Sequence, residues 1–261
     1  MHFDLEKDTA KVRFMLEKRD IPSLVAEVIA VVDVSGSTQS MFYSGAMQAA
    51  LQRVVPVALN FDDNGELPTY LFDDDCHLTA NPITAKNYAT YVKKEILHDG
   101  FELWGGTQLE PVLKRVVRDL GFYDLRESKV GFFKSLFSKS SNDSPDSPVS
   151  MTCSQKSKSG LPAIVYIFTD GENTDHAYTS GLLKRLADAK SEVYFNFIGV
   201  GNVTFNFLRE VADEYPNVGF AQIKDIAATG GSDDIYEYLI PEELTDLLKA
   251  FVGTSAQPVT R

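Results

Sequence analysis

Several features are scarce in this chain of 261 residues, and each scarcity argues against a class of protein. Only two cysteines are present, Cys76 and Cys153, which is too few for a disulfide framework and typical of a reducing compartment. No apolar run approaches the roughly 20 residues that span a bilayer, and the first residues have no apolar signal-peptide core. The sequence therefore predicts a cytoplasmic protein without membrane insertion.

Positive charge is also scarce. The chain has 25 Lys and Arg residues against 37 Asp and Glu residues, so its formal net charge is -12. Such a surface repels nucleic acid and anionic membranes, whose binding usually requires a basic stripe. We therefore expect no nucleic-acid partner. Hydrophobic residues make up 44% of the chain, which is enough for one substantial core.

Apolar runs alternate with amphipathic stretches along most of the chain. Residues 24–32 form a nearly continuous apolar run, which is typical of a strand buried on both faces. Similar runs predict strands at 67–72, 163–169, 193–200 and 218–223. Amphipathic stretches predict helices at 41–61, 84–97, 107–120, 177–190, 205–215 and 241–251, and Pro56 should kink or interrupt the first. This alternation predicts a doubly wound, Rossmann-like α/β fold with helices on both faces of a mostly parallel sheet.

The acidic turn Asp73-Asp74-Asp75 indicates where the sheet ends. It joins the strand at 67–72 to a short strand at 76–79, and a turn this short connects only antiparallel strands. We therefore expect a sixth strand that lies antiparallel at the edge of the sheet. The turn could bind Ca²⁺, but the favoured interpretation is a solvated hairpin turn that blunts the sheet edge.

Two regions lie outside this alternation. Residues 1–23 are expected to form a helical or extended lead-in to a single domain over 24–255. Residues 123–160 hold many serines and little periodicity after Phe137, which predicts a loop or partly disordered insertion. The insertion is interpreted either as a flap packed on the body or as a docking or regulatory segment.

Polar side chains follow two of the predicted strands. Asp33, Ser35 and Ser37 come directly after the first buried run, and Asp170 follows the run at 163–169. Open α/β sheets bind their ligands beyond the carboxyl ends of the strands. Alternate residues of an extended turn point the same way, so one carboxylate and two hydroxyls of the first loop can converge.

A third polar loop contains Thr107. The preceding Gly105-Gly106 pair permits a close backbone approach, and Trp104 is expected at the rim of the site. Together the three loops offer only oxygen ligands, which suit a hard cation such as Mg²⁺, Mn²⁺ or Ca²⁺.

Each loop also has a purely structural interpretation. Ser37 or Thr38 could cap the following helix. Thr107 and Glu110 fit a Thr-x-x-Glu capping box, and Asp170-Gly171 is an ordinary turn pair. The conjunction of the three loops, at the expected edge of the sheet, favours a metal site.

These loops carry a family resemblance. Asp33-Val34-Ser35-Gly36-Ser37, Gly106-Thr107 and Thr169-Asp170-Gly171 resemble the metal-ion-dependent adhesion site of von Willebrand factor A (vWA) domains, over about 24–251. Within that family the chain is most similar to the bacterial TerF-like group associated with tellurium resistance and stress response, at 168–176, 217–220 and 235–240. The resemblance implies a divalent ion bound by Asp33, Ser35, Ser37, Thr107 and Asp170, with Gly36, Gly106, Gly171, Glu172, Asp175 and His176 beside these ligands or at the rim.

Such a site predicts a binding module rather than an enzyme. Two carboxylates and three hydroxyls leave a divalent ion short of charged ligands, so a Glu or Asp of a protein partner could complete the shell. The alternative is a metal-dependent phosphoester hydrolase with His176 as its base. A phosphatase with an aspartate nucleophile usually has a second acid two residues later, where this chain has Ser35. No Gly-x-Ser-x-Gly or Gly-x-x-x-x-Gly-Lys motif is present.

Overall fold

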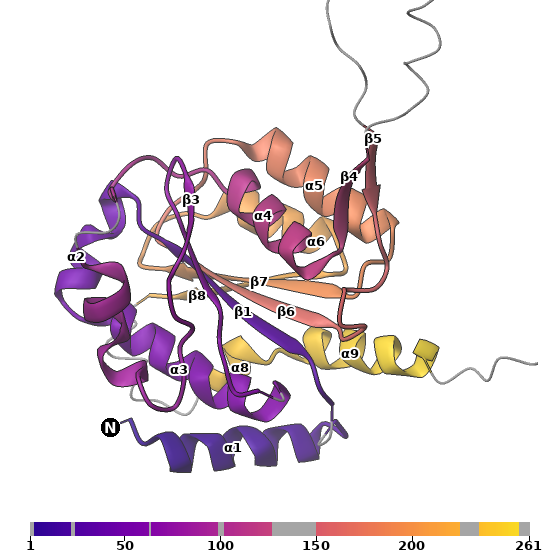
Figure 1. The fold of residues 1–261 in the computed structure, drawn as a ribbon, viewed down its shortest axis with the longest axis horizontal. Coiled ribbons are helices and arrows are strands. Elements are labelled where there is room, and N and C mark those ends of the chain that lie inside the picture. The colour runs from indigo at the N-terminus through magenta and orange to yellow at the C-terminus, as the bar shows by residue number, and fades with distance from the viewer. Residues whose placement is uncertain are drawn as a thin grey trace, which may run out of the picture.

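The computed structural model describes residues 3–21, 24–62, 64–98, 102–126, 150–224 and 235–255. Its centre is a six-stranded sheet in the order β3-β2-β1-β6-β7-β8 (Figure 1). All neighbouring strands are parallel except β3, which pairs antiparallel with β2 at the edge. This confirms the predicted sheet. The strands are β1 (Glu27–Asp33), β2 (Thr69–Phe72), β3 (Cys76–Leu78), β6 (Ala163–Thr169), β7 (Val193–Val200) and β8 (Val218–Ile223).

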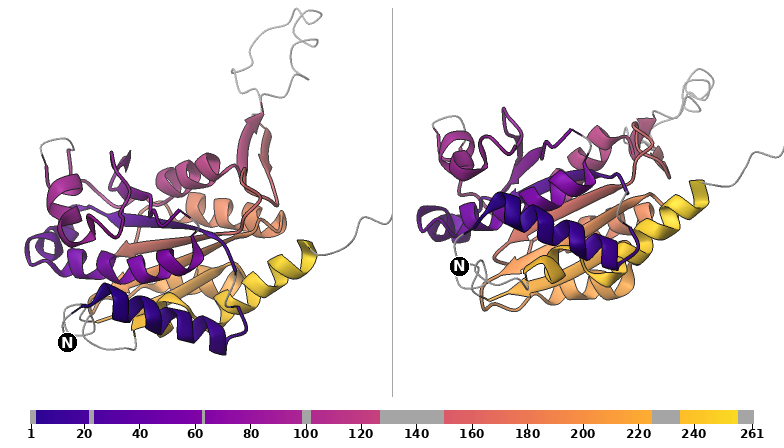
Figure 2. Two further views of the ribbon diagram at one scale, coloured as in Figure 1. Left: turned by 60° about the horizontal axis from the view of Figure 1, so that its bottom comes forward. Right: turned by 90° about the horizontal axis from the view of Figure 1, so that it is seen from below.

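Helices cover both faces of the sheet (Figures 1 and 2). One layer holds α1 (Leu5–Lys18), α2 (Gln39–Tyr43), α3 (Ala46–Phe61), α8 (Ile235–Leu239) and α9 (Glu242–Ser255). The opposite layer holds α4 (Glu110–Leu120), α5 (His176–Asp188) and α6 (Asn206–Glu214). Alternate side chains of β1 point into the two cores, Val28 and Val32 into the first and Ile29 and Val31 into the second. This double burial is why the sequence shows continuous apolar runs.

Two of the expected helices are wrong in detail. The stretch 41–61 is broken at Gly45, whose φ of 82° is left-handed, and Pro56 lies inside α3 without ending it. Packing of the buried face of α3 offsets the hydrogen bond that the proline removes. The stretch 84–97 forms a 3₁₀ turn at Tyr88–Thr90 and a π-helical turn at Val92–Ile96 instead of one α-helix.

The lead-in is helical and docks on the domain. The carboxylate of Asp8 in α1 lies 3.2 Å from Nη1 of Arg53 in α3, and both side chains are buried. Nδ2 of Asn60 donates to the carbonyl of Thr9 at 3.1 Å. Arg19, just after α1, donates to the carbonyl of Ile240 between α8 and α9. These contacts extend the packed body to the N-terminal helix.

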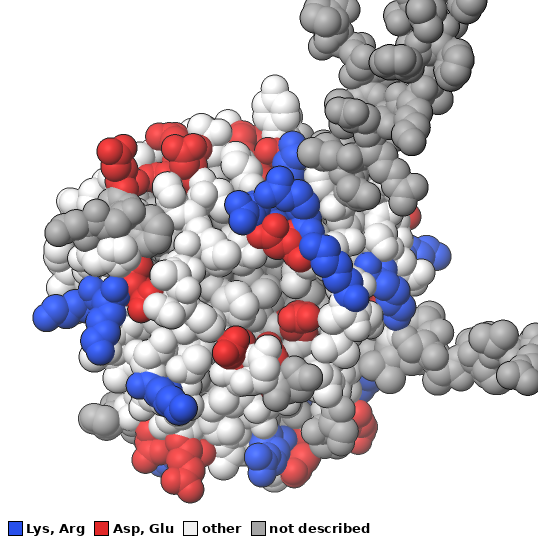
Figure 3. All heavy atoms as spheres, viewed as in Figure 1, with Lys and Arg blue, Asp and Glu red and all other residues white. Residues whose placement is uncertain are grey.

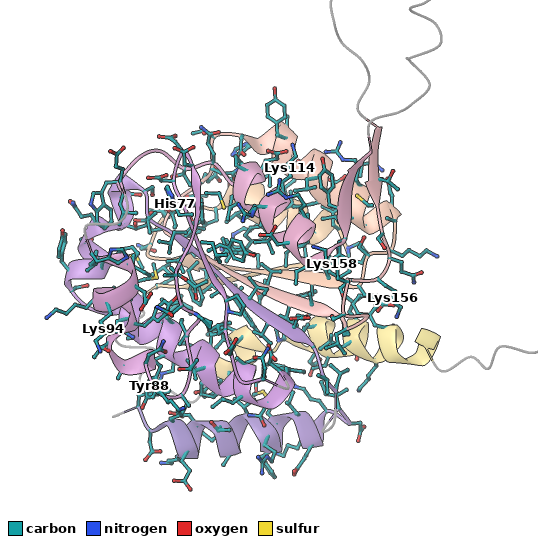
Figure 4. All side chains as sticks on the ribbon, in the orientation of Figure 1. His77, Tyr88, Lys94, Lys114, Lys156 and Lys158 are labelled. Atoms are coloured by element: carbon teal, nitrogen blue, oxygen red, sulfur yellow. The ribbon has the colours of Figure 1, made fainter. Side chains whose placement is uncertain are left out.

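The two ends of the predicted insertion are not loops. β4 (Tyr123–Arg126) and β5 (Ser150–Cys153) pair antiparallel in a separate two-stranded sheet, whereas 127–149 lie outside the described residues. Lys158 follows β5, and its Nζ donates to the carbonyls of Arg118 at 3.3 Å and Asp119 at 3.0 Å (Figure 4). A cation at the end of α4 complements the helix dipole and fixes this segment to the body.

A basic strip runs over α4 although the chain is acidic (Figure 3). Lys114 pairs with Glu110 at 3.2 Å, and Arg115 pairs with Asp119 at 2.6 Å. Because carboxylates lie among these cations, the strip offers less free positive charge than its basic residues suggest. Among the helices in the described ranges, none has the length and apolar content to cross a bilayer.

Candidate metal centre

Two neighbouring strands place the predicted loops at one edge of the sheet. β1 ends at Asp33 and β6 ends at Thr169, and the two strands are adjacent and parallel. Their carboxyl ends therefore lie together, as ligand sites of open α/β sheets require. The third loop is attached beside them, because the backbone N–H of Trp104 donates to the carbonyl of Val34 at 3.0 Å.

Backbone hydrogen bonds join the third loop to both others. The N–H of Gly36 donates to the carbonyl of Gly105 at 3.1 Å. The carbonyl of Thr107 accepts from the N–H of Thr174 at 2.9 Å and from its hydroxyl at 3.1 Å. The three loops therefore form one cross-linked rim.

Four predicted ligands share one side-chain network. The hydroxyl oxygens of Ser35 and Ser37 are 3.2 Å apart, and the Ser37 hydroxyl donates to Oδ1 of Asp170 at 2.7 Å. Oδ1 of Asp33 accepts from the N–H of Ser35 at 2.8 Å, and its Oδ2 accepts from the hydroxyl of Thr169 at 2.6 Å. The fold thus brings Asp33, Ser35, Ser37 and Asp170 together. Thr107 is tied to this group through its backbone.

The helix-cap interpretations of these loops are wrong. Ser37 and Thr38 make no side-chain cap, because the Ser37 hydroxyl donates to Asp170 and the Thr38 hydroxyl donates to the carbonyl of Ser35 at 2.8 Å. The helix after Thr107 has its N-cap at Leu109, so no Thr-x-x-Glu capping box forms. Helix capping therefore does not account for the side chains of Ser37, Thr38 and Thr107.

Burial makes the two carboxylates costly to ionise. Asp33 is fully buried, and this burial raises its pKa to about 6, against smaller lowering effects of the hydrogen bonds from Ser35 and Thr169. The negative charge of Asp170 acts in the same direction. The pKa of Asp170 is itself raised, mainly by burial. A cation placed between these groups would offset both costs.

The donor set fits a hard divalent cation. It consists of carboxylate and hydroxyl oxygens, which suit Mg²⁺, Mn²⁺ or Ca²⁺ better than Zn²⁺. The described part of the chain contains no group of three or more His, Cys, Asp or Glu residues that could hold an ion. An ion at this rim would therefore depend on the hydroxyls as well as on Asp33 and Asp170.

Two predicted rim residues contact the start of α6. Glu172 accepts backbone N–H groups of Asn206 and Phe207 at the start of α6, the latter at 3.2 Å. The exposed ring of His176 stacks on Phe207 with centroids 4.1 Å apart. At Gly171 a side chain would meet no atom within 4 Å, so this glycine is not required by a close approach.

Asp175 joins two loops by capping α4. Its Oδ1 accepts from the N–H of Leu109 at 3.1 Å, and its Oδ2 accepts from the N–H of Glu110 at 2.7 Å. The side-chain amide of Asn173 donates to Asp175 at 2.6 Å. A carboxylate at a helix N-terminus satisfies free N–H groups and complements the helix dipole.

We expect Asp175→Ala to destabilise the protein by about 1–2 kcal/mol, because an N-terminal cap is lost. Urea unfolding followed by circular dichroism measures the change. Asp188→Ala is the matched control. Among the described residues Asp188 pairs only with Lys184, at the exposed end of α5, so the substitution should change stability by less than about 1 kcal/mol. Equal losses in both variants would contradict the capping role.

Sequence reasoning missed the function of the acidic turn between β2 and β3. The buried carboxylate of Asp73 accepts from the N–H of Gly105 at 3.0 Å, and exposed Asp74 accepts from the N–H of Gly106 at 2.7 Å. A Cβ at Gly106 would lie 2.5 Å from Oδ1 of Asp74, so the glycine is needed there. The turn holds the Thr107 loop, and the solvated-turn interpretation is wrong for Asp73. No local pattern in the sequence indicated this contact, because the turn and the glycines are 32 residues apart.

Trp104 lies at the rim as expected. It is half-buried, and its φ of 82° is left-handed. Its ring packs edge-on against Phe42, with centroids 5.5 Å apart, and lies 6.2 Å from the ring of Tyr43. Tyr43 is 71% exposed, so aromatic surface is accessible beside the rim.

The doubly wound sheet defines an open α/β domain, and the oxygen-rich rim lies at the edge where such domains bind their ligands. The model of the vWA-TerF-like family, described as the vWA found in the TerF C terminus, matches residues 25–255. The chain therefore belongs to the vWA-TerF-like family. Domains of the vWA class are generally interaction modules.

Similar proteins were found by sequence and by structure. The chain is 26% identical over 246 residues to the uncharacterized protein YcbR of Bacillus subtilis (strain 168), which covers 92% of this chain and 84% of that protein. Proximal thread matrix protein 1 from the mussel byssus is similar in structure, with 16% identity, a TM-score of 0.50, and coverage of 86% of this chain and 47% of that chain. Manganese-loaded TRAP protein of Plasmodium vivax gives 13% identity, a TM-score of 0.47, and coverage of 84% and 73%. This chain thus spans less than half of the mussel protein.

Proposed function

We propose that this protein is a metal-dependent protein-binding module. Asp33, Ser35, Ser37, Thr107 and Asp170 would hold Mg²⁺ or a similar hard cation, Mn²⁺ or Ca²⁺. The bound cation supplies positive charge and an open coordination position for a Glu or Asp carboxylate of a protein partner. The observation that carries the proposal is the hydrogen-bonded array from buried Asp33 through Ser35 and Ser37 to Asp170.

The residues of this array differ in burial, from fully buried to exposed. Asp33 and Ser35 lie inside the protein, Asp170 is half-buried, and Ser37 is exposed. An ion held by the inner groups would therefore be reached from the solvent side, where Ser37 and Asp170 lie. This supports recognition of a ligand from outside over a purely structural ion.

Among the described residues, no feature favours the alternative of a metal-dependent hydrolase. His176, its candidate base, is exposed and stacks on Phe207. Binding therefore remains the function we propose. Family membership supports a role of this module in a bacterial stress or tellurium-resistance system.

Metal-dependent stability tests the site. We expect millimolar Mg²⁺ to raise the melting temperature of the wild type, because the ion binds the folded state. At 100 times the dissociation constant, this binding raises the free energy of unfolding by about 2.7 kcal/mol. Asp33→Ala and Asp170→Ala should lose this response and stay folded by circular dichroism, whereas Asp188→Ala should keep it. An undiminished response in both site variants would overturn the assignment.

Partner binding is tested separately. The wild-type protein should retain a partner from a bacterial lysate in Mg²⁺ and release it in EDTA. Asp33→Ala should not retain that partner under either condition. A partner that stays bound to the wild type in EDTA, or binds Asp33→Ala equally well, would contradict metal-bridged recognition.

A further inference from the structure

A cavity of about 280 Å³ lies on the sheet edge formed by β8, away from the metal centre. Its walls come from the first halves of β7 and β8, from the end of α6, and from α8 and the start of α9. This volume is near the lower end of the roughly 300–1,000 Å³ of small-ligand pockets. Since the metal centre lies at the carboxyl ends of β1 and β6, the cavity is a separate feature.

Two polar side chains of β7 line this cavity. Tyr194 and Asn196 of β7 are each 1% exposed and both lie in its wall. A Cβ at Gly219 of β8 would overlap the hydroxyl of Tyr194, so the glycine makes room for this group. No described residue hydrogen bonds to the Tyr194 hydroxyl. Because Tyr194 lies in the cavity wall, its hydroxyl is available to a ligand.

Asn196 offers a second oxygen atom. Its Nδ2 donates to the carbonyl of Tyr238 at 3.0 Å and to that of Leu239 at 3.3 Å. These two bonds fix the amide and leave its Oδ1 without a donor among the described residues. The wall therefore offers two oxygen acceptors on largely buried residues of β7, one of which is also held by contacts with α8.

Negative charge surrounds the same cavity. Asp213, Glu237 and Glu243 line it, and no Lys or Arg does. Glu237 is paired with Arg19 at 2.5 Å, whereas Asp213 and Glu243 form no ion pair with a described residue. Burial is the main cause that raises the pKa of Tyr194, and the negative charge of Glu243 is the second. The Glu243 carboxylate therefore lies near the phenol. The remaining wall is largely apolar and includes Val218.

We propose that this cavity binds an alkylammonium or guanidinium group carried on an apolar stem. The oxygen atoms of Tyr194 and Asn196 accept hydrogen bonds from the cation, and Asp213 and Glu243 balance its charge. The apolar wall covers the stem, as it does for lysine and arginine side chains, which bury their methylene groups and keep their charge paired. The ligand is either a basic side chain of a polypeptide or a free amine.

Titration of ¹⁵N-labelled full-length protein tests this site. The probes are N-acetyl-lysine methylamide, N-acetyl-arginine methylamide and 1,5-diaminopentane, with the methylamides of N-acetyl-norleucine and N-acetyl-citrulline as neutral analogues. We expect saturable shifts of the backbone amide signals of Gly219 and Ala221 with a cationic probe. Glu243→Gln should weaken binding on the order of tenfold, and Tyr194→Phe should weaken it less. Glu242→Gln is the matched control, since Glu242 is outside the cavity lining.

The outcomes separate the sources of the ligand. Binding of the blocked amino acids supports a polypeptide side chain, and binding of the diamine alone supports a free amine. Equal shifts with cationic and neutral probes, or an unchanged affinity in folded Glu243→Gln, would overturn the proposal. So would the absence of saturable shifts with any cation. The Mg²⁺ response of Glu243→Gln should equal that of the wild type, so this result does not depend on the metal centre.

Discussion

Asp33→Asn is expected to stabilise the metal-free protein at neutral pH by up to about 3 kcal/mol. Burial raises the pKa of the Asp33 carboxyl from 3.8 to about 6, and each pKa unit corresponds to about 1.4 kcal/mol. Asparagine removes the charge and keeps an acceptor for the N–H of Ser35. The hydroxyl of Thr169 can still donate to the carbonyl of Gly171, which lies 3.1 Å away.

The sign of the pH dependence follows from the raised pKa. The folded protein holds the Asp33 proton more tightly than the unfolded chain does, so this group contributes most stability below about pH 4. That contribution is lost as the pH rises through about 6. In chelator, the wild type should therefore lose stability between these values, and Asp33→Asn should lose less.

Urea unfolding in EDTA across this pH range measures both effects. Added Mg²⁺ should reduce the difference in stability between the wild type and Asp33→Asn at neutral pH, because the cation stabilises only the wild type. This is the usual conflict between stability and function at a binding site. A wild type that is at least as stable as Asp33→Asn in EDTA would show that the buried carboxylate is not strained.

Asp8→Ala is expected to cost about 3–5 kcal/mol, because it leaves the guanidinium of Arg53 buried without its carboxylate. Asp8 is 4% exposed and Arg53 is 6% exposed, and their charged atoms are 3.2 Å apart. Water can therefore reach little of either group after the substitution. The midpoint and slope of urea unfolding measure the loss.

Two further variants identify why Asp8→Ala loses stability. Lys11→Ala removes a partner of Asp8 that is 3.6 Å away and more exposed, and should cost less than about 1 kcal/mol. The double variant Asp8→Leu, Arg53→Leu should be more stable than Asp8→Ala, since neither charge remains buried. A double variant no more stable than Asp8→Ala would indicate that lost packing of α1, rather than an unpaired charge, explains the cost.

The arrangement of the sheet and the clustering of most residues of the candidate metal centre could be predicted from local patterns. Continuous apolar runs marked β1 and β6, and the residues directly after each run had to lie at one edge of a parallel sheet. This predicted that Asp33, Ser35, Ser37 and Asp170 lie close together, as they do, because each is within a few residues of a strand end. The short turn at 73–75 likewise placed β3 antiparallel at the sheet edge.

The contacts that support the site could not be predicted this way. Asp175 caps a helix that begins 65 residues before it, and Asp73 binds the N–H of Gly105, 32 residues later. Such pairs exist only after the sheet brings distant loops together. Helix breaks were also hard to predict, because tertiary packing retained Pro56 within α3, whereas the chain bends at Gly45.

Trp104, whose backbone is left-handed, makes the rim accessible to fluorescence. Trp104 is the only tryptophan of the chain, and its own backbone is bonded to the loop that carries Asp33. Indole fluorescence of this protein therefore comes from one position beside the metal centre. If the proposed ion binds there, the emission of Trp104 should change with its binding, in unmodified protein and in real time. An excitation wavelength that tyrosine does not absorb excludes emission from the rest of the fold.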